Sequence, residues 1–248
     1  MKAITLFILS VFVVLLIWGT KDFPIWGDPH SPANSHVSPY YLENSLKDTD
    51  VPNVVTSVLA DYRGFDTMLE TTVVLIAGIA VSLILRRKHD SNYIRRDQVS
   101  EPDSGLVITT TAKLIIPPAL IFAFYVLAHG HHSPGGGFQS GVIFGSVLIL
   151  YAFSFGLSRA EEVFSEKLQS LCTFTGVLIY SGIGTLCYLL GGNFLDYGRL
   201  SLLLPMEEKY CRSLGILGVE IGVAITVMAV MFSIYSNLVS GGCHEEGL

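Results

Sequence analysis

Two carboxylates stand four residues apart where an apolar stretch of the sequence begins. Asp66 and Glu70 would share one face of a helix there, with their Cβ atoms about 6 Å apart. Carboxylates at that spacing bind a hard cation or share a proton between them. A structural alternative stays open: Asp66 as a helix cap or first-turn residue, and Glu70 stabilised by the positive end of the helix dipole.

A lysine lies deep in a second apolar stretch. Lys113 is eight residues past Gly105, about 12 Å along a helix. Pro117 and Pro118 follow and remove two helical hydrogen bonds, which leaves carbonyl groups unpaired beside this cation. We therefore expect a carboxylate partner or a water-filled cavity at Lys113, the alternative being a side chain that reaches back to the membrane surface.

A third candidate is a lone carboxylate near the end of the sequence. Glu220 lies seven residues past Ser213, about 10 Å along a helix. Three glycines surround it at a small-residue spacing that permits close helix contact: Gly215, Gly218 and Gly222. Glu220 is therefore interpreted either as a neutral acid hydrogen-bonded to a neighbour or as part of a proton or cation route.

The most distinctive string is HGHHSPGGGF, residues 129–138. Its histidines, His129, His131 and His132, suggest a metal site, but neither convergent spacing nor further ligands are evident. Exchange of protons at these rings is conceivable, since histidine titrates near neutral pH. Pro134 and the glycines after it predict a tight turn that another chain can approach closely, which favours a docking or assembly element.

The elements that must position these residues are membrane helices. Of 248 residues, 50% are hydrophobic and only 15% charged, and the net charge of −6 offers no basic surface for nucleic acid. The sequence also lacks a cysteine pattern typical of disulfide scaffolds or iron–sulfur clusters, so no cofactor is expected. Six stretches are long and apolar enough to span a bilayer: 3–19, 67–85, 105–128, 138–158, 170–192 and 213–239.

We therefore predict an all-α, polytopic membrane protein with about six transmembrane helices. Lysine and arginine are more numerous on one side, eight against five, mainly because of the cluster at residues 86–96. The positive-inside rule then places both termini in the cytoplasm, with a long, partly irregular outer loop at residues 21–53. The charged stretch 86–104 predicts a linker between a two-span module, residues 1–98, and a four-span module, residues 99–248.

Two strings carry a resemblance to a known family. The string HHSPGGGFQ, residues 131–139, with the apolar helix after it resembles the MnhB family, the B-type small subunits of Mrp-type cation/proton antiporters. Residues 61–73, DYRGFDTMLETTV, resemble the C-terminal membrane segment of the large A-type antiporter subunit, which is a separate small subunit in membrane-bound hydrogenases. The chain thus looks like a fusion of two neighbouring small subunits.

The resemblance implies a non-catalytic subunit in the cell membrane of a bacterium or archaeon, packed beside larger integral membrane subunits. It implies that Asp66 and Glu70 serve a route for Na⁺ and H⁺, while His131, Pro134, Gly135, Gly136, Gly137 and Phe138 serve structure and assembly. Lys113 and Glu220 join the ion path on the reasoning from residues above. Two alternatives stay open: the same module in a redox-driven pump, and a purely structural adaptor.

Overall fold

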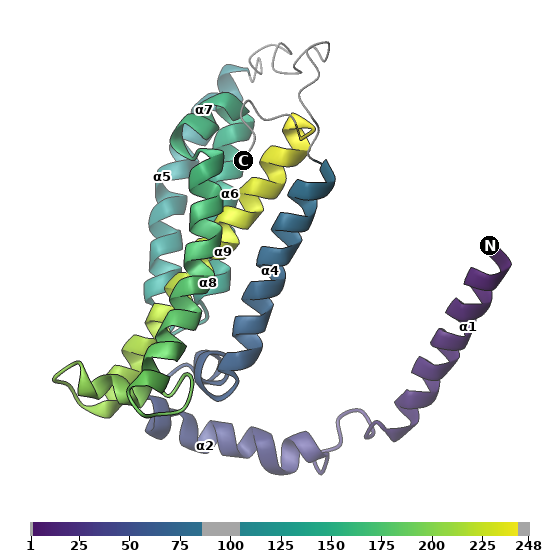
Figure 1. The fold of residues 1–248 in the computed structure, drawn as a ribbon, viewed down its shortest axis with the longest axis vertical. Coiled ribbons are helices and arrows are strands. Elements are labelled where there is room, and N and C mark those ends of the chain that lie inside the picture. Colours follow the sequence, from purple (N-terminus) through teal and green to yellow (C-terminus); the bar gives the residue numbers. More distant parts are fainter. Residues whose placement is uncertain (1, 86–104, 243–248) are drawn as a thin grey trace. The chain divides into compact units, whose positions relative to one another are not determined.

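The computed structural model describes residues 2–85 and 105–242, so the predicted linker at 86–104 lies outside the described residues. The described part is helical and contains no strand (Figure 1). Its α-helices are α1 (Lys2–Gly19), α2 (Ser38–Thr49), α3 (Val54–Ser57), α4 (Gly64–Leu85), α5 (Leu106–Ala128), α6 (Gly137–Phe155), α7 (Leu157–Val163), α8 (Glu166–Leu189) and α9 (Glu208–Ser240).

Six of these helices, α1, α4, α5, α6, α8 and α9, are long and apolar enough to cross a membrane, which confirms the predicted all-α, six-span architecture. One of these helices, α6, ends earlier than predicted because of a glycine. The predicted fourth span reaches residue 158, but α6 ends at Phe155 because Gly156 adopts a φ of +97°, which a helix cannot accommodate. The side of the membrane on which each terminus lies stays a prediction.

The chain divides into two compact units, residues 1–44 and 45–248. The first unit contains α1, a 3₁₀ turn at Thr20–Asp22, a π-helical turn at Ala33–Val37 and the start of α2. The loop at 21–53, expected to be partly irregular, thus also contains short helical segments. The predicted division between residues 98 and 99 stays a prediction about the two sequence modules.

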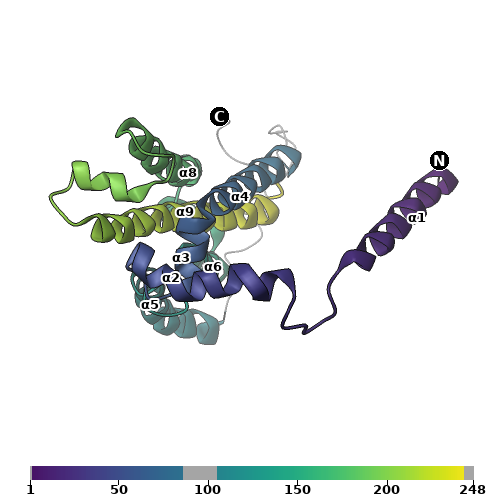
Figure 2. The same ribbon diagram turned by 90° about the horizontal axis from the view of Figure 1, so that it is seen from below.

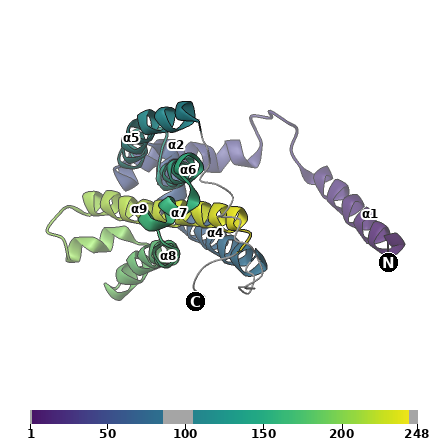
Figure 3. The same cartoon turned by 90° about the horizontal axis from the view of Figure 1, so that it is seen from above.

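The second unit is built around α9, which packs against α4, α5, α6 and α8 (Figures 2 and 3). Small residues let the neighbouring backbones approach: a Cβ atom added at Gly222 would lie 2.6 Å from the carbonyl oxygen of Gly176 on α8. The resulting core includes Tyr180, Tyr197 and Ile216, all fully buried. Residues on α9 are thus fixed against four helices at once.

The loop between α5 and α6 lies directly on α9. Gly136 has a φ of +121°, a conformation that favours glycine, and a Cβ atom at Gly137 would collide with the carbonyl oxygen of Glu220. From the other side, Asn53 donates hydrogen bonds to the carbonyl oxygens of Gly130 and Ser133, both at 2.8 Å. The glycines therefore serve close packing, and the loop is held between α9 and the residues that precede α4.

Candidate functional site

One cavity brings together side chains from both predicted modules. Its volume is about 80 Å³, and it lies among α4, α8, α9 and the glycine loop. The polar or ionisable side chains in its lining are Thr56, Thr67, Glu70, Gln139, Tyr180 and Glu220, together with the backbone of Gly135–Phe138. Two of the four predicted ion-path residues, Glu70 and Glu220, therefore share one cavity.

Glu220 is held in this cavity by the local structure of α9 and the loop. The exposed fraction of its side chain is 10%, and its Oε2 atom has no hydrogen-bond partner among the described residues. That oxygen faces the Nε2 atom of His131 at 3.7 Å. Sequence reasoning missed this contact, because the two residues are far apart in the chain and the string around His131 indicates an assembly motif.

His131 lies in the loop and points inward. Its Nδ1 atom is 3.2 Å from the hydroxyl oxygen of Ser213, and burial together with the nearby His132 lowers the pKa of the imidazole. His129 instead stacks on Tyr125, with ring centroids 5.0 Å apart. The three histidines thus do not converge, and no group of three possible metal ligands occurs in residues 2–85 and 105–242.

Asp66 does not face the cavity that contains Glu70. It lies in the first turn of α4, where the Nε atom of Arg63 donates a hydrogen bond to its Oδ2 atom at 2.6 Å. Glu70, one turn further along α4, lines the cavity at Glu220. The structure therefore places Asp66 and Glu70 at different spaces, with Asp66 in the first turn of α4 as the structural alternative describes, and a shared role of the two carboxylates in an ion path stays a prediction.

Asp66 lines a second, more polar cleft of about 490 Å³, in which the guanidinium of Arg212 is the central group. It contacts both carboxylate oxygens of Asp61, at 3.1 and 3.3 Å, and one oxygen of Asp196, at 3.1 Å. Burial raises the pKa of Asp61, and the charge of Arg212 opposes that rise. Sequence reasoning missed this cluster, although an arginine directly before an apolar stretch is a signal for an ion pair at the end of a membrane helix.

Lys113 does not line either space. Its side chain is exposed on α5, and its Nζ atom lies 6.0 Å from the centre of the Phe155 ring. The expected carboxylate partner is not found in the part of the chain that the structure describes. Lys113 therefore faces outward, and the structure separates it from Glu70 and Glu220.

We expect Lys113→Met to leave the fold of this chain unchanged, because the side chain contributes only one exposed cation–π contact. The midpoint of thermal unfolding should move by less than about 2 °C, measured on the purified protein in detergent. Ala112→Leu is the matched control, since Ala112 is only 2% exposed and a larger side chain there must displace its neighbours. A large loss of stability in Lys113→Met would reveal an internal partner.

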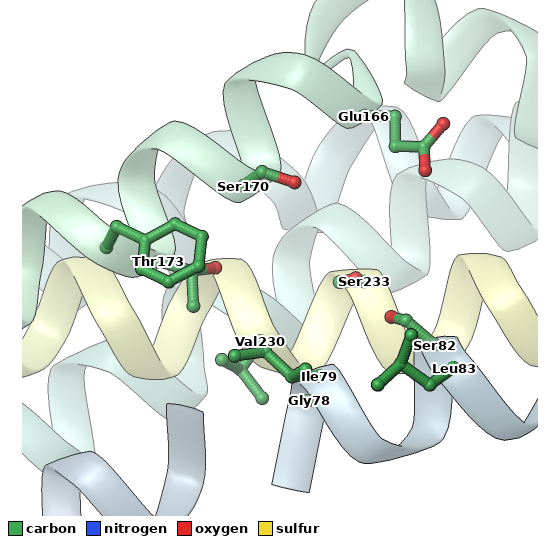
Figure 4. Close-up of a pocket in the computed structure, with 10 residues that line it drawn as sticks. Gly78, Ile79, Ser82, Leu83, Glu166, Ser170, Thr173, Val230 and Ser233 are labelled. Atoms are coloured by element: carbon green, nitrogen blue, oxygen red, sulfur yellow. The ribbon is translucent and has the colours of Figure 1, made fainter. Parts of the chain in front are cut away.

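A third space of about 180 Å³ lies among α4, α8 and α9, towards the other end of these helices. Figure 4 shows hydroxyl groups from all three helices around it, from Ser82, Ser170 and Ser233, with Ile79 and Val230 among the apolar lining residues. Glu166 lies at its edge. Because Glu166 is the only ionisable residue among the described residues that line it, this space is a weaker candidate for an ionic site than the cavity with Glu70 and Glu220.

Comparison with known families accounts for most of the chain. Residues 107–233 match the domain related to the MnhB subunit of Na⁺/H⁺ antiporters, and residues 28–99 match MbhE, the E-type subunit of MBH. A putative antiporter subunit, mnhB2, from Staphylococcus aureus is 33% identical over 132 residues, which are 51% of this chain and 93% of that protein. The resemblance that the sequence carries in its two strings is therefore confirmed.

Other relatives are larger. A probable K⁺/H⁺ antiporter A/B-type subunit from Rhizobium meliloti is 24% identical over 81% of this chain, which spans only 22% of that protein. The structure of the Mrp complex from Dietzia contains a chain that matches all of this one at 25% identity and a TM-score of 0.69, and 27% of that chain is covered.

In a further solved structure, the matching chain has nearly the same length as this one. The structure of the membrane-bound sulfane sulfur reductase, an archaeal respiratory membrane complex, has a TM-score of 0.66 at 25% identity, covering 96% of this chain and 98% of that one. With six apolar helices and relatives in membrane complexes, the chain is a multi-pass cell-membrane protein.

Proposed function

Because the chain belongs to the family of domains related to the MnhB subunit of Na⁺/H⁺ antiporters, we propose that it is a non-catalytic subunit of a membrane complex that exchanges a monovalent cation for protons. The relatives from Staphylococcus aureus and Rhizobium meliloti are described as antiporter subunits, which supports this class of activity. Its partners are then other integral membrane subunits, and the exchanged ions are H⁺ and a cation such as Na⁺ or K⁺.

The observation that carries the proposal is the cavity shared by Glu70 and Glu220. Glu70 belongs to the segment that matches MbhE, and Glu220 to the segment that matches the MnhB domain. Two carboxylates around one small space concentrate negative charge there, and a proton and a cation compete for that charge. Such competition is the elementary requirement for exchanging one ion for the other.

A redox-driven complex is the second candidate. It is favoured by the match to the archaeal respiratory complex, which covers almost the whole of both chains, and by the match to MbhE. In that setting the same cavity would conduct ions while electron transfer in other subunits supplies the energy. Mass spectrometry of the complex purified under mild conditions distinguishes the two, because only the second contains iron–sulfur subunits.

We expect Glu70→Gln to slow cation-driven proton movement at least about tenfold, because the amide cannot exchange a proton at the cavity. The measurement is the collapse of a pH gradient on addition of Na⁺ or K⁺ to inverted membrane vesicles that contain the complete complex. Glu162→Gln is the matched control, since Glu162 is an exposed carboxylate on α7 outside the cavity. Subunit composition should be unchanged in both variants.

The structural adaptor is the outcome that would contradict the proposal. If Glu70→Gln and Glu220→Gln both retain transport within twofold of the unmodified complex, the carboxylates do not lie on the ion path. If instead both variants lose partner subunits during purification, the side chains serve assembly.

A further inference from the structure

Two buried polar atoms face each other with no hydrogen-bond partner among the described residues: the Nε2 atom of His131 and the Oε2 atom of Glu220. They are 3.7 Å apart, and the exposed fractions of the two side chains are 12% and 10%. A buried polar group without a partner destabilises the fold because its lost hydration is not replaced, and an isolated buried charge does so more strongly. This pair of atoms therefore calls for an explanation that satisfies both of them.

One proton between the two atoms satisfies both once the side chains approach from 3.7 Å to hydrogen-bond distance, about 3 Å. If the imidazole carries a hydrogen on Nε2, it donates to a charged Glu220; if Nε2 is bare, it accepts from a protonated Glu220. The Nδ1 atom selects between these states through Ser213, whose hydroxyl can donate to Nδ1 or accept from it at 3.2 Å. The position of the proton between His131 and Glu220 is thus linked to the hydroxyl of Ser213 near the start of α9.

No other described charge replaces this proton. Of the titratable groups around the pair, His132 lies beside His131 in the loop, and Tyr180 on α8 already donates its hydroxyl to the carbonyl oxygen of Gly64 at 2.8 Å. Glu70 on α4 is acidic, and Asp61 and Arg212 are bound to each other. The pair therefore lacks a neighbouring cation that would hold Glu220 permanently ionised.

We propose that His131 and Glu220 form a proton-transfer pair that connects Ser213, near the start of α9, with the cavity at Glu70. A proton arriving at Nδ1 converts the ring to imidazolium; the Nε2–H bond then breaks as an O–H bond forms at Oε2 of Glu220. The ring is left neutral with its hydrogen on Nδ1, and the charge on Glu220 is neutralised. The same steps run in reverse when a proton leaves.

The cavity provides the next step. Its volume of about 80 Å³ exceeds the roughly 10–15 Å³ that one water molecule requires, and its lining is polar enough to hydrogen-bond water. Water there can carry the proton between Glu220 and Glu70. This last step rests on the proposed function, whereas the shared proton between His131 and Glu220 rests on the geometry alone.

The test of the shared proton is spectroscopic and needs no transport. Infrared spectra of the complete complex in lipid are recorded over a range of pH. One protonated-carboxyl band of the unmodified complex should be absent from the spectra of Glu220→Gln. His131→Gln should shift the titration midpoint of that band by one pH unit or more. His129→Gln, at the histidine that stacks on Tyr125, is the control and should leave the midpoint nearly unchanged. A Glu220 band that does not respond to His131→Gln overturns the pair.

The second measurement is transport in vesicles. We expect His131→Gln to slow proton movement about tenfold and Ser213→Ala to slow it less, because Ser213→Ala removes only the hydroxyl at Nδ1 and keeps the imidazole. If His131→Gln prevents assembly of the complex, Ser213→Ala still tests whether the pair transfers protons. If His131→Gln and Ser213→Ala complexes assemble and transport at the unmodified rate, the pair is not a transfer site. A different result would contradict only the proposed ion path. In that case the infrared band of Glu220 responds to His131→Gln, but Glu70→Gln does not change the transport rate.

Discussion

Gly176→Ala is expected to break the packing of α8 on α9. A Cβ atom at this position would collide with the carbonyl oxygen of Gly222 and the hydroxyl of Thr226, and would lie 2.9 Å from the backbone nitrogen of Thr226. Backbone atoms cannot rotate away as side chains do, so the two helices must separate along their contact. We expect a loss of about 3 kcal/mol or more in the free energy of unfolding, seen as a lower thermal midpoint in detergent.

Gly182→Ala is the matched control on the same helix. No atom lies within 4 Å of a Cβ atom built at Gly182, and alanine favours a helix by up to about 1 kcal/mol relative to glycine. The control should therefore be as stable as the unmodified protein or slightly more so. Equal losses in Gly176→Ala and Gly182→Ala would mean that α8 and α9 are not in direct backbone contact.

Arg212→Leu is expected to have the second largest effect. The guanidinium joins Asp61 to Asp196, and the side chains of Arg212, Asp61 and Asp196 are only 26%, 11% and 23% exposed, respectively. Without it, two carboxylates remain close together with little solvent around Asp61. We expect a loss of about 2–3 kcal/mol, at or just below the lower limit of about 3 kcal/mol for a broken buried pair, because water still reaches the cleft.

The effect of Arg212→Leu should depend on pH. Burial already raises the pKa of Asp61 above its ordinary value of 3.8, and the loss of Arg212 removes the charge that opposes this rise. An acid whose pKa is higher in the folded than in the unfolded state destabilises the fold when the pH rises through that interval, and this cost disappears on acidification. The deficit of the variant should therefore be largest at neutral pH and shrink as the pH falls.

Arg199→Leu separates this effect from a general loss of positive charge. Arg199 also contacts Asp196, at 3.6 Å, but it is 51% exposed and does not contact Asp61. Its replacement should change the thermal midpoint little at any pH. A deficit in Arg212→Leu that is constant with pH, or shared by Arg199→Leu, would contradict the role assigned to the buried pair.

The spans were predictable from the sequence because their signal is local. A run of about twenty apolar residues identifies a membrane helix without knowledge of its neighbours, and all six were found. Their ends were less predictable, since single residues such as Gly156 decide where a helix stops. The helical part of residues 21–53 was missed because α2, SPYYLENSLKDT, carries a polar composition that is equally typical of a loop.

The candidate site was only partly predictable, because it depends on contacts between distant residues. Glu70 and Glu220 could be selected as ionisable groups in apolar stretches, but nothing in the spacing indicated that they share a cavity. Asp61 and Arg212 are 151 positions apart, and their pairing becomes evident only when α9 is placed beside the residues that precede α4. For Lys113, depth along the helix was predictable, whereas the direction of its side chain was not.

The hydrogen bonds between the residues before α4 and the glycine loop would hold the two segments together even if two separate genes encoded them. Asn53 and Thr56 contact the backbone of residues 130, 131 and 133 through four hydrogen bonds of 2.8–2.9 Å, and none of these contacts requires a peptide connection between the two segments. Two genes that specify the segments separately would still produce surfaces that recognise each other. Fusion into one reading frame then fixes their stoichiometry at one to one, while Asn53, Thr56 and the loop supply one part of the contact, beside the pair of Asp61 and Arg212.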